Sequence, residues 1–393
     1  MKKLITILLL FASSSLLAQK EFQKRFQTLL IDAEDGSVIE LPAGTFQLDG
    51  SLWLDGKKNV IIKGAGMDKT ILNFTGQISG AEGIKVTNAS DITVQDLTVQ
   101  NTKGDPIKTQ LVEGLIFKNL KAEWTNGPDK DNGSYAFYPV QCTNVLIDNC
   151  IAIGASDAGI YVGQSKYIIV RNSKAFHNVA GIEIENSLYA DVYDNETYNN
   201  TGGILIFDLP DLLQKEGGYV RVYYNHVHDN NHVNFAPKGN IVGKVPQGTG
   251  IMVLATRNVE IFENRIINNI TTGTAIVSYH ITENPINDKD YKPLPADVYI
   301  HHNYYERPNV RTTGKGRMGK MFRFKLRFGK DVPHILYDGI GEGNRNICIR
   351  QNENESFVNI DAENGFKNIS RDISSHNCEG KRIQPVTFSA KQG

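Results

Sequence analysis

The stretch Val259-Glu-Ile261-Phe-Glu-Asn264 is a clear copy of a pattern that recurs along the chain. Two apolar residues are separated by one residue, and an Asn or a small residue follows three positions later. The stretches Val220-Arg-Val222-Tyr-Tyr-Asn225 and Val298-Tyr-Ile300-His-His-Asn303 repeat it. Earlier copies begin at Val60, Ile92, Leu115, Val145, Ile168 and Ala190. The shortest intervals between these starts are 22 and 23 residues, so a unit of about 22 residues repeats and the longer intervals contain insertions.

Each unit also contains a second short segment with the same alternation, which usually follows a glycine. Examples are Ile160/Val162, Ile182/Ile184, Ile204/Ile206, Ile251/Val253 and Ile276. Strands this short bury one side and need partners from the next unit, so the repeat predicts an all-β solenoid, a parallel β-helix. A β-propeller would need longer repeats, and a leucine-rich solenoid would show a Leu-x-x-Leu-x-Leu frame.

One corner of each predicted coil carries the same residue type. Asn195, Asn225, Asn264 and Asn303 occupy equivalent positions in successive units. An interior Asn can hydrogen-bond the turn backbone and its neighbour one coil away. We therefore expect an asparagine ladder.

The two ends of the repeat differ from its middle. Phe22, Phe26, Leu29 and Leu30 have helical spacing, which predicts an amphipathic helix that caps the first coil. After Arg307 the repeat stops and basic residues crowd the segment from Arg311 to Lys330; they could attract an anionic polysaccharide or envelope surface, or form a solvated loop and strand. The expected domains are a signal peptide (1–18), the β-helix (19–306) and a C-terminal capping segment (307–393).

The first residues resemble an export signal. Met1-Lys-Lys3 precedes an apolar run from Leu4 to Phe11 and a small-residue region that ends at Ala18. The run is too short for a membrane span, which needs roughly 20 residues. We expect a secreted or periplasmic protein, with no membrane span and a monomeric state.

Composition and cysteine usage limit the partners. The net charge is -1, so the chain lacks the excess of basic residues that nucleic-acid-binding proteins carry. In an exported protein Cys348 and Cys378 are the expected disulfide, because both lie in the C-terminal segment. Cys142 and Cys150 could also pair, or remain buried thiols, since the repeat register points Cys150 into the core.

Two short motifs add a family resemblance. Leu41-Pro-Ala-Gly-Thr-Phe46 and Ile62-Lys-Gly-Ala-Gly66, together with the coils, resemble bacterial right-handed parallel β-helix proteins of the pectin-lyase-like superfamily. The resemblance covers residues 21–305. Relatives include pectate lyases, polygalacturonases, mannuronan epimerases, alginate lyases and non-enzymatic NosD-type proteins, so membership implies the fold without choosing a reaction. The sequence lacks an Asp-Pro-His-Asp stretch, an Arg-x-Pro-x-x-Arg stretch and calcium-roll nonapeptides, so no catalytic residue transfers by motif.

Insertions predict where a ligand would bind. Extra residues occur from Asp208 to Gly218, from Asn230 to Gly248 and from His280 to Pro295, on both sides of the second strands. Loops on both sides of one strand column would form a groove. Its expected floor consists of the outward residues Tyr161, Glu183, Glu185, Leu205, Phe207, Met252, Val277 and Tyr279.

The residue types in this groove suit a uronate-containing, acidic polysaccharide. A lyase or epimerase neutralises the substrate carboxylate and removes the carbon-5 proton. The candidates for base and acid are Lys238, His232, Tyr279 and His280. Candidate carboxylate partners, or ligands of calcium if that cofactor is used, are Asp157, Glu183, Glu185 and Asp208. Candidate substrate-binding residues are Tyr161, Phe207, Arg257 and Lys244.

Each candidate has an alternative interpretation. Glu183 and Glu185 could be a solvated strand face, and Asp157 could be a turn residue before Ala158-Gly159. Opposed carboxylates would also suit a glycoside hydrolase. His226 and His228 share a strand face and could bind a metal with His232, but no metal is assigned. The expected function is a lyase or epimerase on an acidic polysaccharide; the alternative is a non-catalytic β-helix that binds glycan or an envelope partner protein, as NosD-type proteins do.

Overall fold

The computed structural model describes residues 21–312, 320–341 and 345–389. The expected signal peptide lies outside these residues, as do Lys315 and Arg317 of the basic segment. In the described part of the chain, no helix is long and apolar enough to cross a membrane.

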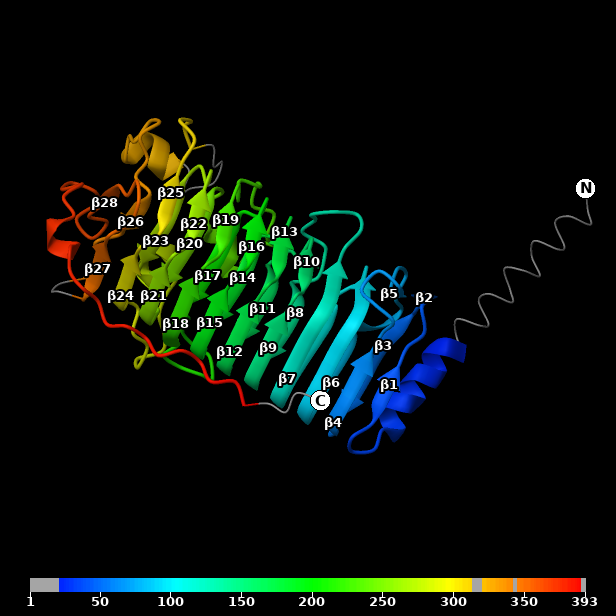
Figure 1. Cartoon of the computed structure of the whole chain (residues 1–393). Coiled ribbons are helices and arrows are strands. Elements are labelled where there is room, and N and C mark those ends of the chain that lie inside the picture. The colour runs from blue at the N-terminus through cyan, green and yellow to red at the C-terminus, as the bar shows by residue number, and fades with distance from the viewer. Residues whose placement is uncertain (1–20, 313–319, 342–344, 390–393) are drawn as a thin grey trace, which may run out of the picture.

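The chain winds into a solenoid whose coils stack by parallel strand pairing (Figure 1). Each coil contributes a strand to three faces, here called A, B and C. Two long strands, β6 (Ser79–Gln100) and β7 (Ile107–Glu123), run through all three faces in succession. The shorter strands each belong to one face.

Face A contains the first strand of each predicted unit. Its strands are β1 (Val38–Glu40), β4 (Lys58–Lys63), β9 (Thr143–Asp148), β12 (Lys166–Arg171), β15 (Leu188–Tyr193), β18 (Gly218–Tyr223), β21 (Arg257–Phe262), β24 (Ala296–His301) and β27 (Ile347–Arg350). Val220, Val259 and Val298 pair in register, which confirms the predicted stacking.

Face B contains short strands that follow the first corner. They are β2 (Gly44–Gln47), β5 (Thr70–Asn73), β10 (Ile151–Ile153), β13 (Lys174–Phe176), β16 (Glu196–Tyr198), β19 (His226–His228), β22 (Arg265–Ile267) and β25 (Tyr304–Glu306).

Face C contains the predicted second strands. They are β3 (Gly50–Asp55), β8 (Tyr135–Val140), β11 (Ala158–Gly163), β14 (Ala180–Glu185), β17 (Gly202–Phe207), β20 (Thr249–Leu254), β23 (Thr272–Val277), β26 (Ile335–Tyr337) and β28 (Phe357–Asn359). Ile160, Ile182 and Ile204 pair in register, as the alternation predicts.

Inward Ile, Val and Leu residues fill the solenoid as one continuous core. At the predicted corner, each Asn side chain from Asn195 through Asn264 donates to the side-chain oxygen of the Asn one coil further on, and Asn303 extends the ladder to Asn352. A second ladder, which the repeat pattern did not predict, joins Asn178, Asn200, Asn230 and Asn269 at the corner between faces B and C. Both ladders satisfy buried polar backbone without breaking the apolar stack.

The N-terminal end is closed as the sequence predicts. Residues 21–32 form a helix at the end of the stack (Figure 1). Phe26 and Leu30 enter the core and Phe22 packs against it, whereas Leu29 is exposed.

The C-terminal end is more regular than expected. Strand pairing continues beyond residue 306, because β26 and β28 extend face C and β27 extends face A. The repeat is hidden there because its spacing changes, so the predicted boundary at residue 306 does not coincide with the last rung. Among the described residues of this segment, the short helices η3 (Met321–Lys325) and η4 (Ser374–His376) lie before and after these strands.

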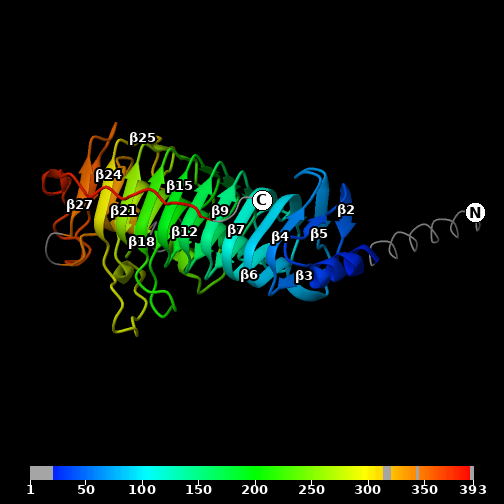
Figure 2. The same cartoon turned by 60° about the horizontal axis from the view of Figure 1, so that its bottom comes forward.

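Residues 379–389 run across face A as an extended tail (Figures 1 and 2). The predicted disulfide between Cys348 and Cys378 fixes the start of this tail. Further on, the Ile383 amide donates to Glu260 and the Val386 amide to Asp191. Cys142 and Cys150 are buried free thiols, which decides between the two alternatives in favour of the unpaired one.

Candidate functional site

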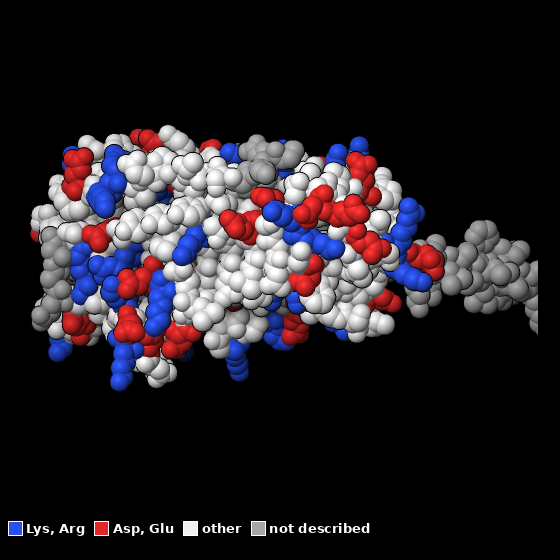
Figure 3. Space-filling view, turned by 90° about the horizontal axis from the view of Figure 1, so that it is seen from below, with Lys and Arg blue, Asp and Glu red and all other residues white. Residues whose placement is uncertain are grey.

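The three predicted insertions lie beside face C and contact one another. In the structure they span residues 208–217 (the first loop), residues 229–248 with the short helix η1 (Ile241–Lys244) (the second or middle loop), and residues 278–295 with η2 (Tyr279–Thr282) (the third loop). Salt bridges from Lys215 to Asp288 and from Lys292 to Glu216, both 2.8 Å long, join the first loop to the third. Basic and acidic side chains are mixed at this end of the solenoid, on the left in Figure 3, so the protruding loops form no single-sign surface.

The expected open floor of the groove is wrong for the later coils. Leu205, Phe207, Met252 and Val277 do point outward from face C, but they are buried in a second apolar cluster. Val242 and Val245 of the middle loop join this cluster, so the loop folds onto the strands instead of standing beside them. Phe207, a predicted sugar-stacking residue, is therefore inaccessible. The number of inserted residues in the sequence does not indicate whether a loop stands beside the strands or covers them.

The earlier coils of face C hold a cluster of carboxyl groups, here called the carboxyl cluster: Asp157, Glu183 and Glu185. Their exposed fractions are 5%, 1% and 8%. The alternative of a solvated strand face is therefore wrong for both glutamates. The structure brings together these three predicted residues, and Tyr161 lies among them, since its hydroxyl donates to Glu185 Oε1 at 2.6 Å.

Glu183 is unusual because neither of its side-chain oxygens has a hydrogen-bond partner within the described residues. Burial, and then the charges of Asp157 and Glu185, raise its pKa well above the usual value. An ionised carboxylate without partners in such a place would lose several kcal/mol of solvation, so the side chain retains its proton. A buried, unpartnered acid marks a site built for something other than stability.

The neighbouring acids keep protons at higher pH than usual as well. Burial raises the pKa of Asp157 to about 7, although an Asn240 hydrogen bond of 2.8 Å opposes the shift. Burial likewise raises the pKa of Glu185 to about 7, against the Tyr161 hydrogen bond. In the described part of the chain, no Lys or Arg forms a salt bridge with these three groups. They therefore share protons near neutral pH.

Asp208 lies at the end of β17, next to the first loop. Burial raises its pKa to about 7, and its side chain accepts a hydrogen bond of 2.9 Å from the Gly217 amide. Its backbone oxygen accepts from the Tyr291 hydroxyl. This predicted acid thus helps to anchor two loops and also contributes charge to the Glu185 environment.

An aromatic group beside the carboxyl cluster was not predicted. Tyr135 lies 4.2 Å and Tyr138 5.1 Å from Tyr161 between ring centroids, and Lys108 lies 4.7 Å above the Tyr138 ring. Tyr135 and Tyr138 are half-buried, so these two rings lie between the buried carboxyl cluster and the protein surface. Their signal was the alternation in β8, which the insertion before Val145 obscured.

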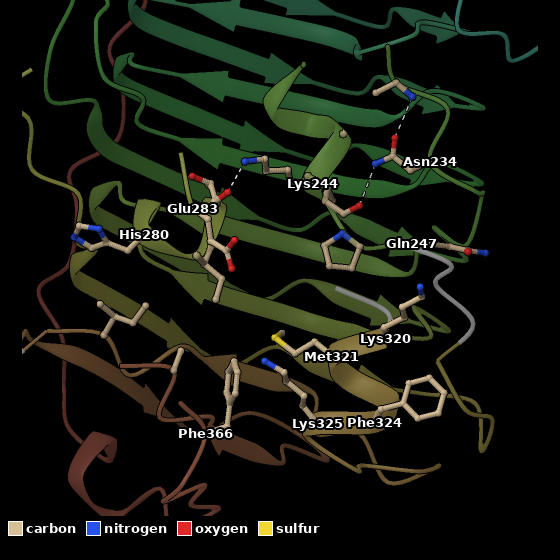
Figure 4. A pocket seen from close by; sticks show the side chains of 18 of the residues that line it. Asn234, Lys244, Gln247, His280, Glu283, Lys320, Met321, Phe324, Lys325 and Phe366 are labelled. Carbon is tan, nitrogen blue, oxygen red and sulfur yellow. Dashed lines mark hydrogen bonds between the residues drawn. The ribbon is translucent and has the colours of Figure 1, made fainter. Parts of the chain in front are cut away.

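A separate cavity of about 840 Å³ opens where the second and third loops meet the C-terminal segment (Figure 4). Lys244, Lys320 and Lys325 line it, together with Phe324, Phe366 and His280. We call it the lysine pocket. Lys244 donates to the Thr282 backbone oxygen and to Asn284 Oδ1, which positions it at the rim of the third loop. Two of the three lysines, Lys320 and Lys325, belong to the basic segment. The sequence did not indicate that this segment lies against the second and third loops.

The other candidate residues are dispersed. Lys238 is exposed on the middle loop, and His232 is held by a 2.8 Å contact between its Nδ1 and the Val233 oxygen. Tyr279 is buried and accepts a 3.4 Å hydrogen bond from Asn284. Arg257 lies at the start of β21 on face A, 3.8 Å from Asp297, and so away from the predicted groove.

The metal-ligating groups of the described residues do not gather at the carboxyl cluster. Three ligand atoms that lie within 4.8 Å of one another occur instead at Glu196, His226 and His228 on face B. His232, the third member suggested by the sequence, is not part of this group.

Comparisons with known proteins agree with this architecture. A family model described as a right-handed β-helix region matches residues 129–288. No curated protein matches. Among solved structures, the A-module of the Azotobacter vinelandii mannuronan C-5 epimerase AlgE6 is 15% identical, with a TM-score of 0.51 over 85% of this chain and 90% of that one.

Two further structures are similar at greater distance. The AlgE4 A-module of the same organism is 17% identical over 81% of this chain and 86% of that one, with a TM-score of 0.49. The GH136 lacto-N-biosidase of Eubacterium ramulus is 14% identical over 82% and 62%, with a TM-score of 0.47. The chain is thus a right-handed parallel β-helix protein, and carbohydrate-active enzymes are among the solved structures that it resembles.

Proposed function

We propose that this protein is an exported, monomeric enzyme that acts on an acidic polysaccharide as a lyase or an epimerase. The observation that carries the proposal is Glu183, a buried acid whose side-chain oxygens have no hydrogen-bond partner among the residues that the structure describes, between two further carboxyl groups on an outward face. The disulfide is consistent with an oxidising compartment.

The carboxyl cluster can supply each proton step of such a reaction. Protonated Glu183 donates a hydrogen bond to the substrate carboxylate, which lowers the barrier to removal of the carbon-5 proton. Glu185, with a pKa of about 7, accepts that proton at neutral pH. In elimination, the carbon-4 to oxygen bond breaks and the leaving oxygen takes a proton from the Tyr161 hydroxyl. In epimerisation, the Tyr161 hydroxyl instead gives its proton to carbon 5 on the side opposite to the one from which Glu185 removed a proton.

The lysine pocket supplies the charge that the carboxyl cluster lacks. Lys244, Lys320 and Lys325 can pair with carboxylates of neighbouring sugar units, while Phe324 and Phe366 offer apolar faces. The middle loop contacts both places, since Asn240 bonds Asp157 and Lys244 lines the pocket. In this proposal the loop opens at the Asn240 contact to admit substrate.

The test is to offer the protein alginate, pectate and glycosaminoglycans in deuterated buffer. We expect unsaturated products that absorb in the near ultraviolet, or deuterium at carbon 5. Glu183→Gln and Glu185→Gln should each lower the rate at least about 100-fold, whereas Glu113→Gln, an exposed change on another face, should not. Absence of both signals from all polymers, with folded protein, would contradict the proposal. New reducing ends without unsaturation would indicate a hydrolase instead.

The burial of the carboxyl cluster favours one alternative, a non-catalytic protein that binds glycan through the lysine pocket alone. In that case acidic polymers would bind without turnover. Lys325→Gln would weaken binding, and Glu183→Gln would leave it unchanged.

A further inference from the structure

A cluster of metal-ligating side chains lies on face B, outside the proposed glycan site. Glu196 of β16 and His226 of β19 are direct partners in the parallel ladder, and His228 is two residues further along β19. His228 therefore points to the same side as His226. All three side chains are partly buried.

We propose that Glu196, His226 and His228 bind a divalent transition-metal ion such as Zn²⁺. Two imidazoles and one carboxylate are a ligand set that Zn²⁺ accepts, and three protein ligands leave a position for water or another group. Ca²⁺ prefers oxygen ligands and should not bind here.

The distances fit such an ion. With bonds of about 2.0–2.1 Å, tetrahedral zinc holds its ligand atoms about 3.4 Å apart. His228 Nε2 and Glu196 Oε1 are 3.3 Å apart, and the ligand atoms of all three residues lie within 4.8 Å of one another. Small side-chain rotations of His226 would complete the geometry, because its ring already stacks on that of His228 with centroids 4.0 Å apart.

Neighbouring groups already orient two of the ligands. Asp229 Oδ2 lies 2.8 Å from His228 Nδ1, so the other ring nitrogen faces Glu196. A carboxylate behind a histidine in this way fixes its tautomer and strengthens it as a ligand. The Tyr198 ring stacks on His228 at 5.3 Å with an interplanar angle of 7°.

An aromatic column alone does not account for the arrangement. Phe176, Tyr198 and His228 do stack along face B, which would explain an aromatic ring at position 228. It does not explain why Glu196 and His226 occupy the neighbouring column beside it. Lys174 binds the second oxygen of Glu196 at 2.8 Å, and Arg265 is the ladder partner of His226. The positive charges of Lys174 and Arg265 both disfavour a bound cation at this place, so removal of either charge should strengthen metal binding.

The experiment is calorimetric titration of the tag-free, chelator-treated full chain with Zn²⁺. We expect one saturable site. Glu196→Gln and His228→Gln should each weaken binding more than about 100-fold, and Asp229→Asn about tenfold. Lys174→Gln should tighten binding, because it removes a competing cation from Glu196. His302→Gln, at an exposed histidine between β24 and β25, is the matched control and should leave Zn²⁺ binding unchanged.

A second measurement checks the ligands directly. Co²⁺ in place of Zn²⁺ should give visible bands of a nitrogen- and oxygen-ligated four- or five-coordinate ion, and these should vanish in His226→Gln. Lack of saturable Zn²⁺ binding would overturn the proposal, as would binding that survives both Glu196→Gln and His228→Gln. Ca²⁺ competing equally with Zn²⁺ would also overturn it.

Discussion

Two neighbouring strands of face C fill equivalent outward positions with opposite chemistry. Glu183 of β14 is in register with Leu205 of β17, and Glu185 with Phe207. All four side chains are buried. Leu205 and Phe207 lie under the middle loop in an apolar cluster, where burial stabilises the fold. The two glutamates occupy the same positions one coil earlier, where the burial of a carboxyl group disfavours folding. The fold therefore does not need glutamate at these positions.

The largest effect should come from the apolar coil. Phe207→Ala removes a fully buried ring and should lower the free energy of unfolding by about 3–5 kcal/mol. Urea unfolding followed by circular dichroism measures this. A decrease of less than about 1 kcal/mol in the free energy of unfolding would mean that the middle loop does not cover the apolar cluster. The proposed difference between the apolar coil and the carboxyl coil would then be wrong.

The carboxyl coil should respond in the opposite direction. Glu183→Leu replaces an unpartnered acid by the residue that β17 uses, and should raise the free energy of unfolding at pH 8 by about 1–3 kcal/mol. Glu113→Leu, an exposed control, should change it by less than about 0.5 kcal/mol. Destabilisation by Glu183→Leu comparable to that of Phe207→Ala would show that Glu183 serves stability after all.

The same coil should make stability depend on pH. The pKa values of Asp157 and Glu185 are about 7 in the folded protein, above the unfolded values near 4. Between these limits the folded state holds more protons, so the free energy of unfolding falls as pH rises from about 4 to 7. In Glu183→Leu the free energy of unfolding should fall less steeply with pH. The slope should decrease by up to about 1.4 kcal/mol per pH unit for each extra proton that the folded state no longer binds. Unfolding curves at pH 5, 6, 7 and 8 measure the slope; equal slopes would contradict the raised pKa values.

The smallest effect concerns the contact between loop and cluster. Asn240→Ala removes one hydrogen bond to Asp157 and should lower the free energy of unfolding by about 1 kcal/mol. Because that bond holds the Asp157 pKa down, its loss should raise the pKa further. Hydrogen exchange of the middle loop should become faster in this variant while β14 stays protected. Unchanged exchange would argue against opening at this contact.

Period-2 alternation and corner residues were enough to predict the stacked coils. Val220, Val259 and Val298 align as expected. A shift of one residue between neighbouring coils would turn these inward side chains outward, so the buried face fixes the register. The Asn ladder follows for the same reason, since each Asn needs the next as its partner. The rungs after residue 306 escaped prediction because their spacing is irregular.

The site could be predicted only by its residues, not by its surroundings. Glu183 and Glu185 were placed on the correct face, but whether that face is open depends on how residues 229–248 fold, and the repeat says nothing about inserted loops. The lysine pocket joins Lys244 to Lys320 and Lys325, which are far apart in sequence and lie outside the regular rungs. Contacts between irregular segments leave no periodic signal.

The most direct measurement is a carbon-13 NMR titration of the side-chain carboxyl groups in protein labelled at glutamate, with Glu183→Gln and Glu185→Gln used to assign the two signals. We expect Glu185 to titrate near pH 7 and Glu183 to keep its proton above that. If both signals titrate below pH 5, the carboxyl cluster is ionised at neutral pH and cannot neutralise a uronate or supply a proton, and the proposed reaction loses its basis.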